Sequence, residues 1–309
     1  FVSTAGRSET PGSFLLRRAI RVVPLYWLVT LGLALIALAG LKPIGIVELR
    51  PDYVVQSLLF LPFSRGGYVE PLNSVGWTLN YEMFFYAGFA ALLLVSDLRA
   101  RLIGLAAAFG ALVLLGLAPV PGLYWAYYTK PIVLEFVAGA ALGYAYLRCG
   151  APSPGFPVRR AAVGALAVAG ALILGGHAVA GALGADLEMT GFLRPLVWGS
   201  AAALAVGAVL LLERGGIVLR SRWLFSQGNA SYAFYLIHNL MLHAGAKVAA
   251  VLVVPGPLRV VLVFVLAFSA SVLLGEWLFR CVERPIGAAL RRLCEGTRAL
   301  DRCPARFLP

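Results

Sequence analysis

An acidic residue stands near the start of the apolar stretch SVGWTLNYEMFFYAGFAALLLV, residues 74–95. A charged side chain in the middle of a bilayer costs roughly 2.5–3.5 kcal/mol, so an acidic residue in such a segment needs a functional or structural reason. On a helix, Glu82 shares a face with Thr78 and Tyr86, and both hydroxyl groups could satisfy its carboxyl group. Glu82 is therefore a candidate for positioning or deprotonating the hydroxyl of a substrate.

Trp77 and Asn80 lie close to Glu82 in the same stretch, near the expected mouth of the helix. An aromatic ring and an amide beside a carboxylate are groups that could hold a sugar. The alternative is that Glu82 pairs with an arginine of another helix and only fixes the packing.

A histidine occupies the second stretch of interest, ASYAFYLIHNLML, in which Tyr235 and His238 fall on one helical face. Counted from the ends of the expected spans, His238 lies about 11 Å from the inner edge and Glu82 about 8 Å from the outer edge of a hydrocarbon core about 30 Å thick. We therefore expect His238 on the inner side of Glu82, about 10 Å away in depth, and no simple dyad. His238 is either a core residue bonded to Tyr235 or another hydroxyl, or a residue with a catalytic or donor-contacting role.

Three arginines form a compact cationic patch in FLLRRAIRVVPLYW, residues 14–27. Arg17 and Arg21 are one helical turn apart, and Arg18 lies beside them. Guanidinium groups match the oxygens of phosphate and pyrophosphate, so the patch could bind an anionic substrate. Positive-inside anchoring explains a basic turn equally well, so both interpretations stay open.

A short motif, CVERPI, places Glu283 and Arg284 directly before Pro285. Because proline interrupts helices, we expect the last helix to end here. The same spacing predicts a local ion pair between Glu283 and Arg284 at the helix end.

Membrane-spanning helices must position these residues. Of the 309 residues, 61% are hydrophobic and 13% are charged, and the mean hydropathy is +0.86, outside the range of soluble domains. The sequence therefore predicts an all-α integral membrane protein, a polytopic helix bundle. The stretch 53–63 is apolar but too short to span, so we expect it to be interfacial or re-entrant. The eight expected spans are about 22–41, 77–95, 102–120, 131–147, 161–181, 192–212, 231–254 and 258–280.

The orientation of these helices follows from the basic residues. With a cytoplasmic N-terminus, 19 of the 26 Lys and Arg residues fall on the inner side and seven on the outer side. This asymmetry predicts that both termini of the chain are cytoplasmic. The net charge of +12 is explained by anionic lipid at the inner face, so no nucleic acid partner is expected. The cysteines and histidines form no cluster with metal-ligand spacing, so no metal site is expected.

Four stretches, FLLRRAIRVVPLYW, SVGWTLNYEMFFY, ASYAFYLIHNL and VERPI, occur in this order along nearly the whole chain. In this combination the sequence resembles the membrane acyltransferase-3 family, which includes bacterial O-acetyltransferases that modify lipopolysaccharide, exopolysaccharide and peptidoglycan. The resemblance implies a ten-helix protein of the bacterial inner membrane. Such a protein passes an acyl group, usually from acetyl-CoA in the cytoplasm, to a hydroxyl of an extracytoplasmic glycan. Acyl-CoA, the glycan and membrane lipid are then the expected partners, and no permanently bound cofactor is expected.

The resemblance also assigns roles to the candidate residues. Arginines at the inner side would face the donor, and the residues around Glu82 would belong to the acceptor side. The predicted site comprises Glu82 and His238 as catalytic residues, Arg17, Arg18 and Arg21 as donor-binding residues, and Trp77, Asn80 and Tyr86 as acceptor-binding residues.

One feature of the family has no counterpart in this sequence. The family's first helix carries an arginine and, further along, the histidine usually taken as the general base. We expect residues 1–290 to form one acyltransferase-3 transmembrane domain that lacks its first two helices and this histidine, followed by a basic cytoplasmic tail at 291–309. Eight spans together with two missing ones would give ten.

Two other classes of membrane protein compete with this interpretation. A transporter or flippase of a polysaccharide precursor would use ionisable residues at the midplane for coupling or binding. No inverted repeat is visible in the sequence, which argues against it. A non-catalytic scaffold would leave Glu82 without a role.

Overall fold

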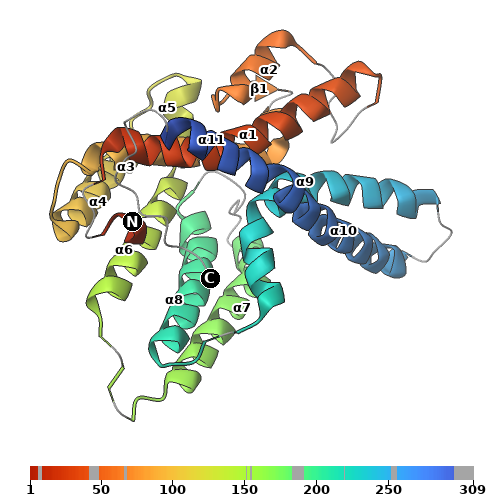
Figure 1. Cartoon of the computed structure of the whole chain (residues 1–309). Helices are drawn as coiled ribbons and strands as arrows, with labels where there is room; N and C mark the ends of the chain where they lie inside the picture. Colours follow the sequence, from red (N-terminus) through yellow and green to blue (C-terminus); the bar gives the residue numbers. More distant parts are fainter. Residues whose placement is uncertain are drawn as a thin grey trace. The chain divides into compact units, whose positions relative to one another are not determined.

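The computed structural model describes residues 1–5, 9–41, 49–65, 68–150, 152–153, 155–182, 191–218, 220–251 and 256–295. This part of the chain is almost entirely helical, as Figure 1 shows. Its strands are two residues each, β1 (Ser64–Arg65) and β2 (Tyr68–Val69), and pair antiparallel. The all-α prediction is therefore confirmed.

The chain divides into two compact units, each built from separate segments. Unit 1 comprises Phe1–Pro11 and Ala87–Arg220, and unit 2 comprises Gly12–Tyr86 and Ser221–Pro309. All eight residues of the predicted site belong to unit 2. Residues 296–309 of the expected tail lie outside the described residues, and the domain boundaries stay a prediction.

Unit 1 contains the helices of the middle of the chain. A cap defines the start of α4, because the Asp97 carboxylate accepts a hydrogen bond of 2.7 Å from the backbone N–H of Ala100. The helices α7 and α8 pack against one another, as do α4 and α6. The elements of unit 1 are η1 (Val2–Thr4), the end of α3 (Trp77–Leu92), α4 (Leu98–Leu115), α5 (Leu123–Tyr128), η4 (Pro131–Val133), α6 (Leu134–Arg148), α7 (Val158–Ala182), η5 (Pro195–Gly199) and α8 (Ser200–Arg214).

Unit 2 combines helices from both ends of the chain. Its helix pair α9 and α10 approaches closely, since a Cβ atom added at Gly275 would lie 3.1 Å from the Cα of Phe234. Small residues at such a crossing let two helix backbones meet. The elements of unit 2 are α1 (Pro11–Leu38), α2 (Pro51–Leu58), β1, β2, η3 (Ser74–Gly76), the start of α3, α9 (Arg222–Val251), α10 (Gly256–Leu278), η6 (Phe279–Glu283) and α11 (Arg284–Glu295).

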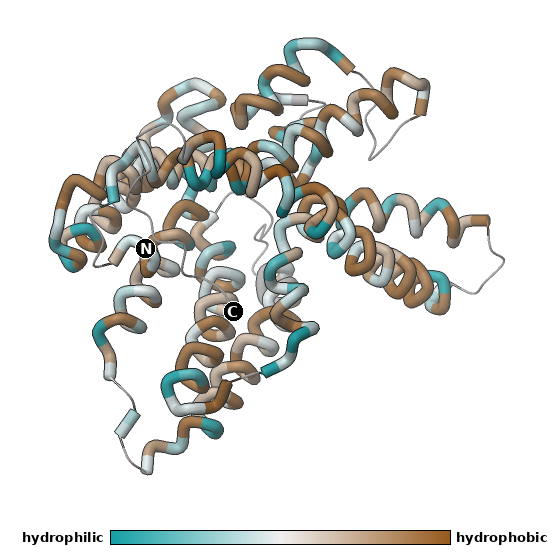
Figure 2. Tube along the Cα trace, in the orientation of Figure 1, coloured by the Kyte–Doolittle hydropathy of each residue, from teal (hydrophilic) through white to brown (hydrophobic). Residues whose placement is uncertain are grey.

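Each of the eight expected spans falls on a helix. Among the described residues, five helices are long and apolar enough to cross a bilayer: Pro11–Leu38, Leu98–Leu115, Val158–Gly176, Pro195–Arg214 and Gly256–Cys294. Figure 2 shows α10 as hydrophobic along most of its length. The helices α3 and α6 have only 16 and 15 residues, so a topology with eight spans stays a prediction.

Large apolar side chains cover the surfaces of several helices. Leu174 on α7 is 85% exposed and Leu273 on α10 is 72% exposed. Soluble proteins rarely present apolar surface on this scale, so these faces suit contact with lipid chains. The composition and these faces together identify a membrane protein.

The last helix does not end at Pro285 as expected. Helical structure is continuous from Gly256 to Cys294, and Figure 1 shows α10 and α11 as one run of blue ribbon. The five residues Phe279–Glu283 form a π-helical turn just before the proline. Proline lacks an N–H and its ring clashes with the carbonyl one turn earlier, and a widened turn relieves both problems without ending the helix.

Candidate functional site

The start of α3 and the middle of α9 are joined by a set of hydrogen bonds within unit 2. Asn239 Nδ2 donates to Ser74 Oγ at 2.5 Å, and the Tyr235 hydroxyl donates to the Val75 carbonyl at 2.7 Å. Thr78 Oγ1 lies 2.5 Å from the same tyrosine oxygen. We call these five residues the register cluster. It brings two of the motifs, SVGWT and YLIHN, into direct contact.

The register cluster fixes how the two helices are aligned. Ser74 and Val75 of η3 and Thr78 of α3 supply the contacts on one side, and Asn239 and Tyr235 of α9 supply those on the other. His238 is next in sequence to Asn239, which bonds Ser74 of η3, whereas Glu82 lies one turn beyond Thr78 on α3. The expected separation of the two residues in depth stays a prediction.

The start of α9 differs from the expected span. The helix begins at Arg222, nine residues before the expected start at residue 231. His238 is therefore more than two turns further from the start of its helix than the sequence suggested. Through its neighbour Asn239 it lies toward the Ser74 end of the α3 motif, whereas Glu82 lies further along α3.

Glu82 is linked to the arginines of α1 through one tyrosine. The Tyr86 hydroxyl donates a hydrogen bond to Glu82 Oε1, which confirms the predicted contact at i+4. The Cζ atom of Arg18 lies 5.4 Å from the ring centroid of Tyr86 and equally far from that of Phe14. A cation over two aromatic faces is held by their negative π surfaces. Thr78 does not serve Glu82, because its hydroxyl contacts Tyr235 instead.

Tyr232 and Glu283 extend this arrangement. The Tyr232 hydroxyl donates to the Val22 carbonyl on α1 at 2.7 Å, and its ring lies within electrostatic range of Glu82 and Glu283. Glu283 lies within the electrostatic reach of Arg21. Among the described residues Glu283 Oε2 is buried and has no hydrogen-bond partner, and the expected ion pair with Arg284 is not formed. We call Arg18, Arg21, Glu82, Tyr86, Tyr232 and Glu283 the carboxylate–arginine cluster.

The sequence analysis missed Tyr232 and misread Glu283. Tyr232 could have been found from the sequence, because Tyr232, Tyr235 and Asn239 follow one another at helical spacing and so share a face of α9. Glu283 lies in the π-helical turn Phe279–Glu283, and no simple spacing rule predicts such a turn.

His238 has a defined tautomer. Its Nδ1 lies 2.6 Å from the Tyr235 carbonyl oxygen, and the ring stacks at 6.1 Å on Phe234. Because a carbonyl oxygen can only accept, Nδ1 must carry the proton, and Nε2 is the basic nitrogen. The expected partner was a hydroxyl group, and the structure supplies a backbone carbonyl instead.

The remaining predicted residues are distributed around these clusters. Trp77 is half-buried and meets Tyr81 edge to face at 6.1 Å. Arg17 is half-buried on α1, one turn before Arg21. The acceptor-binding role of Trp77 and the donor-binding role of Arg17 stay predictions.

Asn80 is buried and not at an open mouth. It is 1% exposed, and neither its Oδ1 nor its Nδ2 has a hydrogen-bond partner among the described residues. It lies one turn from Gly76, where an added Cβ would be 2.7 Å from the Tyr26 hydroxyl. Tight packing of this helix face against α1 explains the burial.

The described residues contain no group of three or more His, Cys, Asp or Glu side chains that could hold a metal ion. The groups available in unit 2 are instead carboxylates, guanidinium groups, tyrosine hydroxyls and one imidazole. These can bind an anion, exchange a proton and stabilise a developing oxyanion.

Comparisons with known proteins agree with this set of groups. The family model described as an acyltransferase domain matches residues 2–276. The chain is 35% identical over 286 residues to the exopolysaccharide production protein ExoZ of Rhizobium meliloti (strain 1021), a match that covers 91% of this chain and 82% of that protein. No solved structure matches the chain significantly.

Proposed function

This chain is a membrane acyltransferase of the acyltransferase-3 family, and we propose that it transfers an acyl group from cytoplasmic acyl-CoA to a hydroxyl of an extracytoplasmic glycan. Acetyl is the proposed acyl group, and an exopolysaccharide or lipopolysaccharide is the proposed acceptor. The similarity to a protein named for exopolysaccharide production supports this choice of acceptor. A flippase of a polysaccharide precursor gains no support from the family.

The contacts of Tyr86 with Glu82 and with Arg18 are the observation that carries the proposal. They place a carboxylate, a hydroxyl and a guanidinium group in succession inside a helical unit. Acyl transfer needs a base for the acceptor hydroxyl and cationic or hydrogen-bonding groups for the oxyanion and the donor phosphates. Such groups are most effective where water is restricted.

The proposed reaction uses these groups in sequence. Arg17, Arg18 and Arg21 bind the phosphates of the donor and hold its thioester near Glu82. The acceptor oxygen bonds to the carbonyl carbon, the carbon–sulfur bond breaks, and the hydroxyl proton passes through the carboxylate to the departing thiolate. His238, with a basic Nε2, exchanges protons about 10 Å further along the helix pair.

The acceptor side is proposed to involve Trp77, Asn80 and Tyr86. Trp77 offers an aromatic face, on which sugar rings stack. Asn80 offers an amide with neither polar atom hydrogen-bonded, and it would become a ligand when the α1–α3 contact opens. Tyr86 contacts both Glu82 and Arg18, so it would mark the point where acceptor and donor meet.

The proposed topology follows the distribution of basic residues. Eight spans in a bacterial inner membrane, with both ends of this chain in the cytoplasm, put most arginines beside anionic lipid. The arginines of α1 then meet acyl-CoA on the cytoplasmic side, and Trp77 lies toward the outside.

Reconstitution tests this proposal directly. The full-length protein is placed in vesicles with labelled acetyl-CoA on one side and the host glycan on the other. We expect label to appear in the glycan, and we expect mass analysis to show fewer acetyl groups in the surface polysaccharide of a deletion strain. Unlabelled glycan together with unchanged acetylation in that strain would contradict the proposed reaction.

A further inference from the structure

An apolar cavity lies within unit 1, at the ends of α6 and α8. Its volume is about 340 Å³, which falls within the range of about 300–1,000 Å³ typical of sites for small molecules. Its walls include Leu142 of α6, Leu210 and Leu211 of α8, and Phe156 of the segment between α6 and α7. A cavity with such walls suits a hydrocarbon chain better than a polar ligand.

A charged side chain, Arg214 in the last turn of α8, lines the same cavity. Its Cζ atom lies 4.3 Å from the ring centroid of Tyr146, another lining residue. Its Nε atom is buried and has no hydrogen-bond partner among the described residues. The cavity therefore joins an apolar interior to a guanidinium group that is stacked on an aromatic face.

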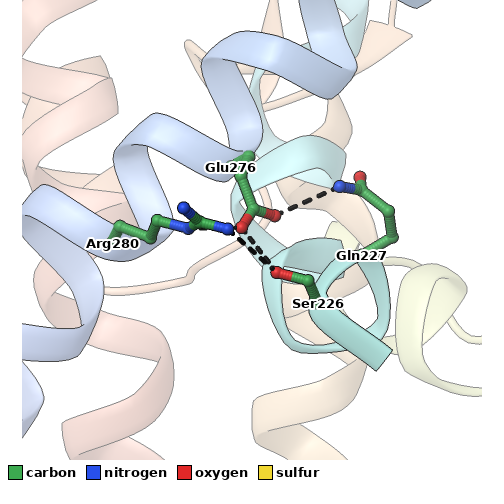
Figure 3. Close-up of polar contacts among 4 residues, drawn as sticks. All are labelled: Ser226, Gln227, Glu276 and Arg280. Carbon is green, nitrogen blue, oxygen red and sulfur yellow. Dashed lines mark hydrogen bonds and ion pairs between the residues drawn. The ribbon is translucent and has the colours of Figure 1, made fainter. Parts of the chain in front are cut away.

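Arg280 shows how an arginine is neutralised elsewhere in the structure. Its Nε donates to Glu276 Oε1 at 2.5 Å, and Figure 3 shows Ser226 beside the same pair. Within the described part of the chain no ion pair involves Arg214, and the adjacent Glu213 accepts from the Tyr146 hydroxyl at 3.3 Å. A guanidinium group without a carboxylate can bind the oxygens of a phosphate.

Further arginines gather at this end of unit 1. Arg148 ends α6, Arg159 and Arg160 lie in the first turn of α7, and all three are exposed. A Cβ atom added at Gly215 would lie 2.7 Å from Val158 Cγ1, so the start of α7 packs against the end of α8. Together with the arginine of the cavity, they outnumber the one acidic residue of these helix ends. This positive charge attracts anionic lipid headgroups.

Two ordinary effects account for arginines at helix ends. A helix C-terminus attracts cations, and basic residues bind lipid headgroups. Neither effect explains an apolar cavity directly beside the charge. A ligand that satisfies both features needs a hydrocarbon chain with an anionic group at one end. Phospholipids have this design, and basic pockets between membrane helices bind anionic headgroups.

We propose that unit 1 binds one anionic phospholipid, with an acyl chain in the apolar cavity and its phosphate at Arg214. The bilayer around the protein supplies this ligand, and the arginines of α6 and α7 add attraction at longer range. The proposal does not depend on the reaction that the protein catalyses, because the residues proposed for that reaction belong to unit 2.

Cys149 provides a chemical probe of the cavity, because it lines the cavity and is exposed. The full-length protein, with serine at every other cysteine position, is purified in a non-ionic detergent and labelled with a neutral maleimide. Labelling is timed without lipid and with short-chain phosphatidylglycerol, short-chain phosphatidylcholine, inorganic phosphate or acetyl-CoA. We expect phosphatidylglycerol to slow labelling about 5-fold more than the zwitterionic phosphatidylcholine. Inorganic phosphate and acetyl-CoA should have no effect.

Variants separate the two parts of the site, each compared with its own labelling rate without lipid. Arg214→Gln should remove the preference for phosphatidylglycerol, whereas Arg160→Gln, which changes an exposed arginine outside the cavity lining, should keep most of it. Ala145→Phe fills the cavity and should abolish protection by both lipids. Added phosphatidylglycerol should also raise the melting temperature of the wild-type protein more than that of Arg214→Gln.

The comparison of the two lipids with Arg214 intact decides the proposal even if a variant fails to fold. Equal protection by both lipids, or by neither, would overturn it, and so would an unchanged lipid preference in Arg214→Gln. Protection by inorganic phosphate alone would indicate an anion site with no place for a chain. Protection by acetyl-CoA alone would assign the cavity to the donor. Either result also contradicts the proposal.

Discussion

The register cluster and the carboxylate–arginine cluster share the helices α3 and α9 but use their polar groups differently. In the register cluster, neutral groups meet at 2.5–2.7 Å, and each contact closes one hydrogen bond between helices. In the carboxylate–arginine cluster, the Glu82 carboxylate accepts a hydrogen bond from Tyr86, whose ring lies under the Arg18 guanidinium group, and neither charged group is joined to the other by an ion pair among the described residues. The neutral hydrogen bonds of the register cluster hold α3 and α9 in one alignment. The charged groups of the carboxylate–arginine cluster can still bind a ligand.

This difference predicts that the two clusters respond differently to substitution. Changes in the register cluster should lower the free energy of unfolding and affect turnover only as a consequence. Changes in the carboxylate–arginine cluster should lower turnover in a protein of normal stability. The variants below are ordered from the largest expected effect to the smallest.

Glu82→Gln should have the largest effect. It keeps the shape of the side chain and a hydrogen bond from Tyr86 but removes the charge and the base, so we expect kcat to fall by about 100- to 10,000-fold. Glu213→Gln is the matched control, because Glu213 is exposed in unit 1 and accepts from Tyr146 at 3.3 Å. Label transfer in vesicles measures both. Full activity of Glu82→Gln would remove the catalytic assignment.

Gly76→Ala should destabilise the junction between the clusters. The added Cβ would lie 2.7 Å from the Tyr26 hydroxyl and 2.9 Å from Pro71 Cγ, so a cost of about 1–3 kcal/mol is expected. Tyr26→Phe should restore part of the loss, since it removes the nearest atom. Gly32→Ala is the control, because nothing lies within 4 Å of its Cβ position. Thermal unfolding in detergent measures the difference, and equal melting temperatures for the two alanine variants would contradict the packing described.

Tyr235→Phe should cost about 1–2 kcal/mol of stability, since the Val75 carbonyl and the Thr78 hydroxyl lose a partner inside the unit. Its effect on kcat should be far smaller than that of Glu82→Gln. Tyr124→Phe on α5, 51% exposed, serves as the comparison. A large loss of kcat with unchanged thermal unfolding would move Tyr235 from the register cluster to the catalytic group.

Asp52→Asn should have the smallest effect. Arg50 contacts Asp52 through two hydrogen bonds of 3.0 and 3.2 Å in an exposed position, and the Arg50 guanidinium holds the pKa of Asp52 below its usual range. Any stability from this pair is present above the usual pKa of an aspartate and is lost as pH falls through the lowered pKa. We expect no measurable change in melting temperature at neutral pH, because exposed pairs contribute little. A clear shift at neutral pH would mean that this pair is not solvent-exposed.

Local spacing explains what the sequence could predict. The Glu82–Tyr86 contact and the shared face of Arg17 and Arg21 are properties of a single helix, and both are present in the structure. The positions of the helices also followed from apolar runs, because each run must be buried or face lipid.

Contacts between helices explain what the sequence could not predict. Thr78 bonds Tyr235 of another helix, and Asn80 is buried by packing against α1, so neither outcome is a matter of spacing. The place of His238 along its helix depended on where α9 begins, and the polar residues at its start kept its first nine residues out of the apolar span. Glu283 required an irregular turn that hydropathy does not reveal.

The register cluster also has a mechanical consequence. Four side chains of the register cluster hydrogen-bond the start of α3 to the middle of α9. The Glu276 carboxylate does the same between α10 and the start of α9. The side chains of the register cluster and Glu276 thus connect α9 at two separate points, once to the start of α3 and once to α10.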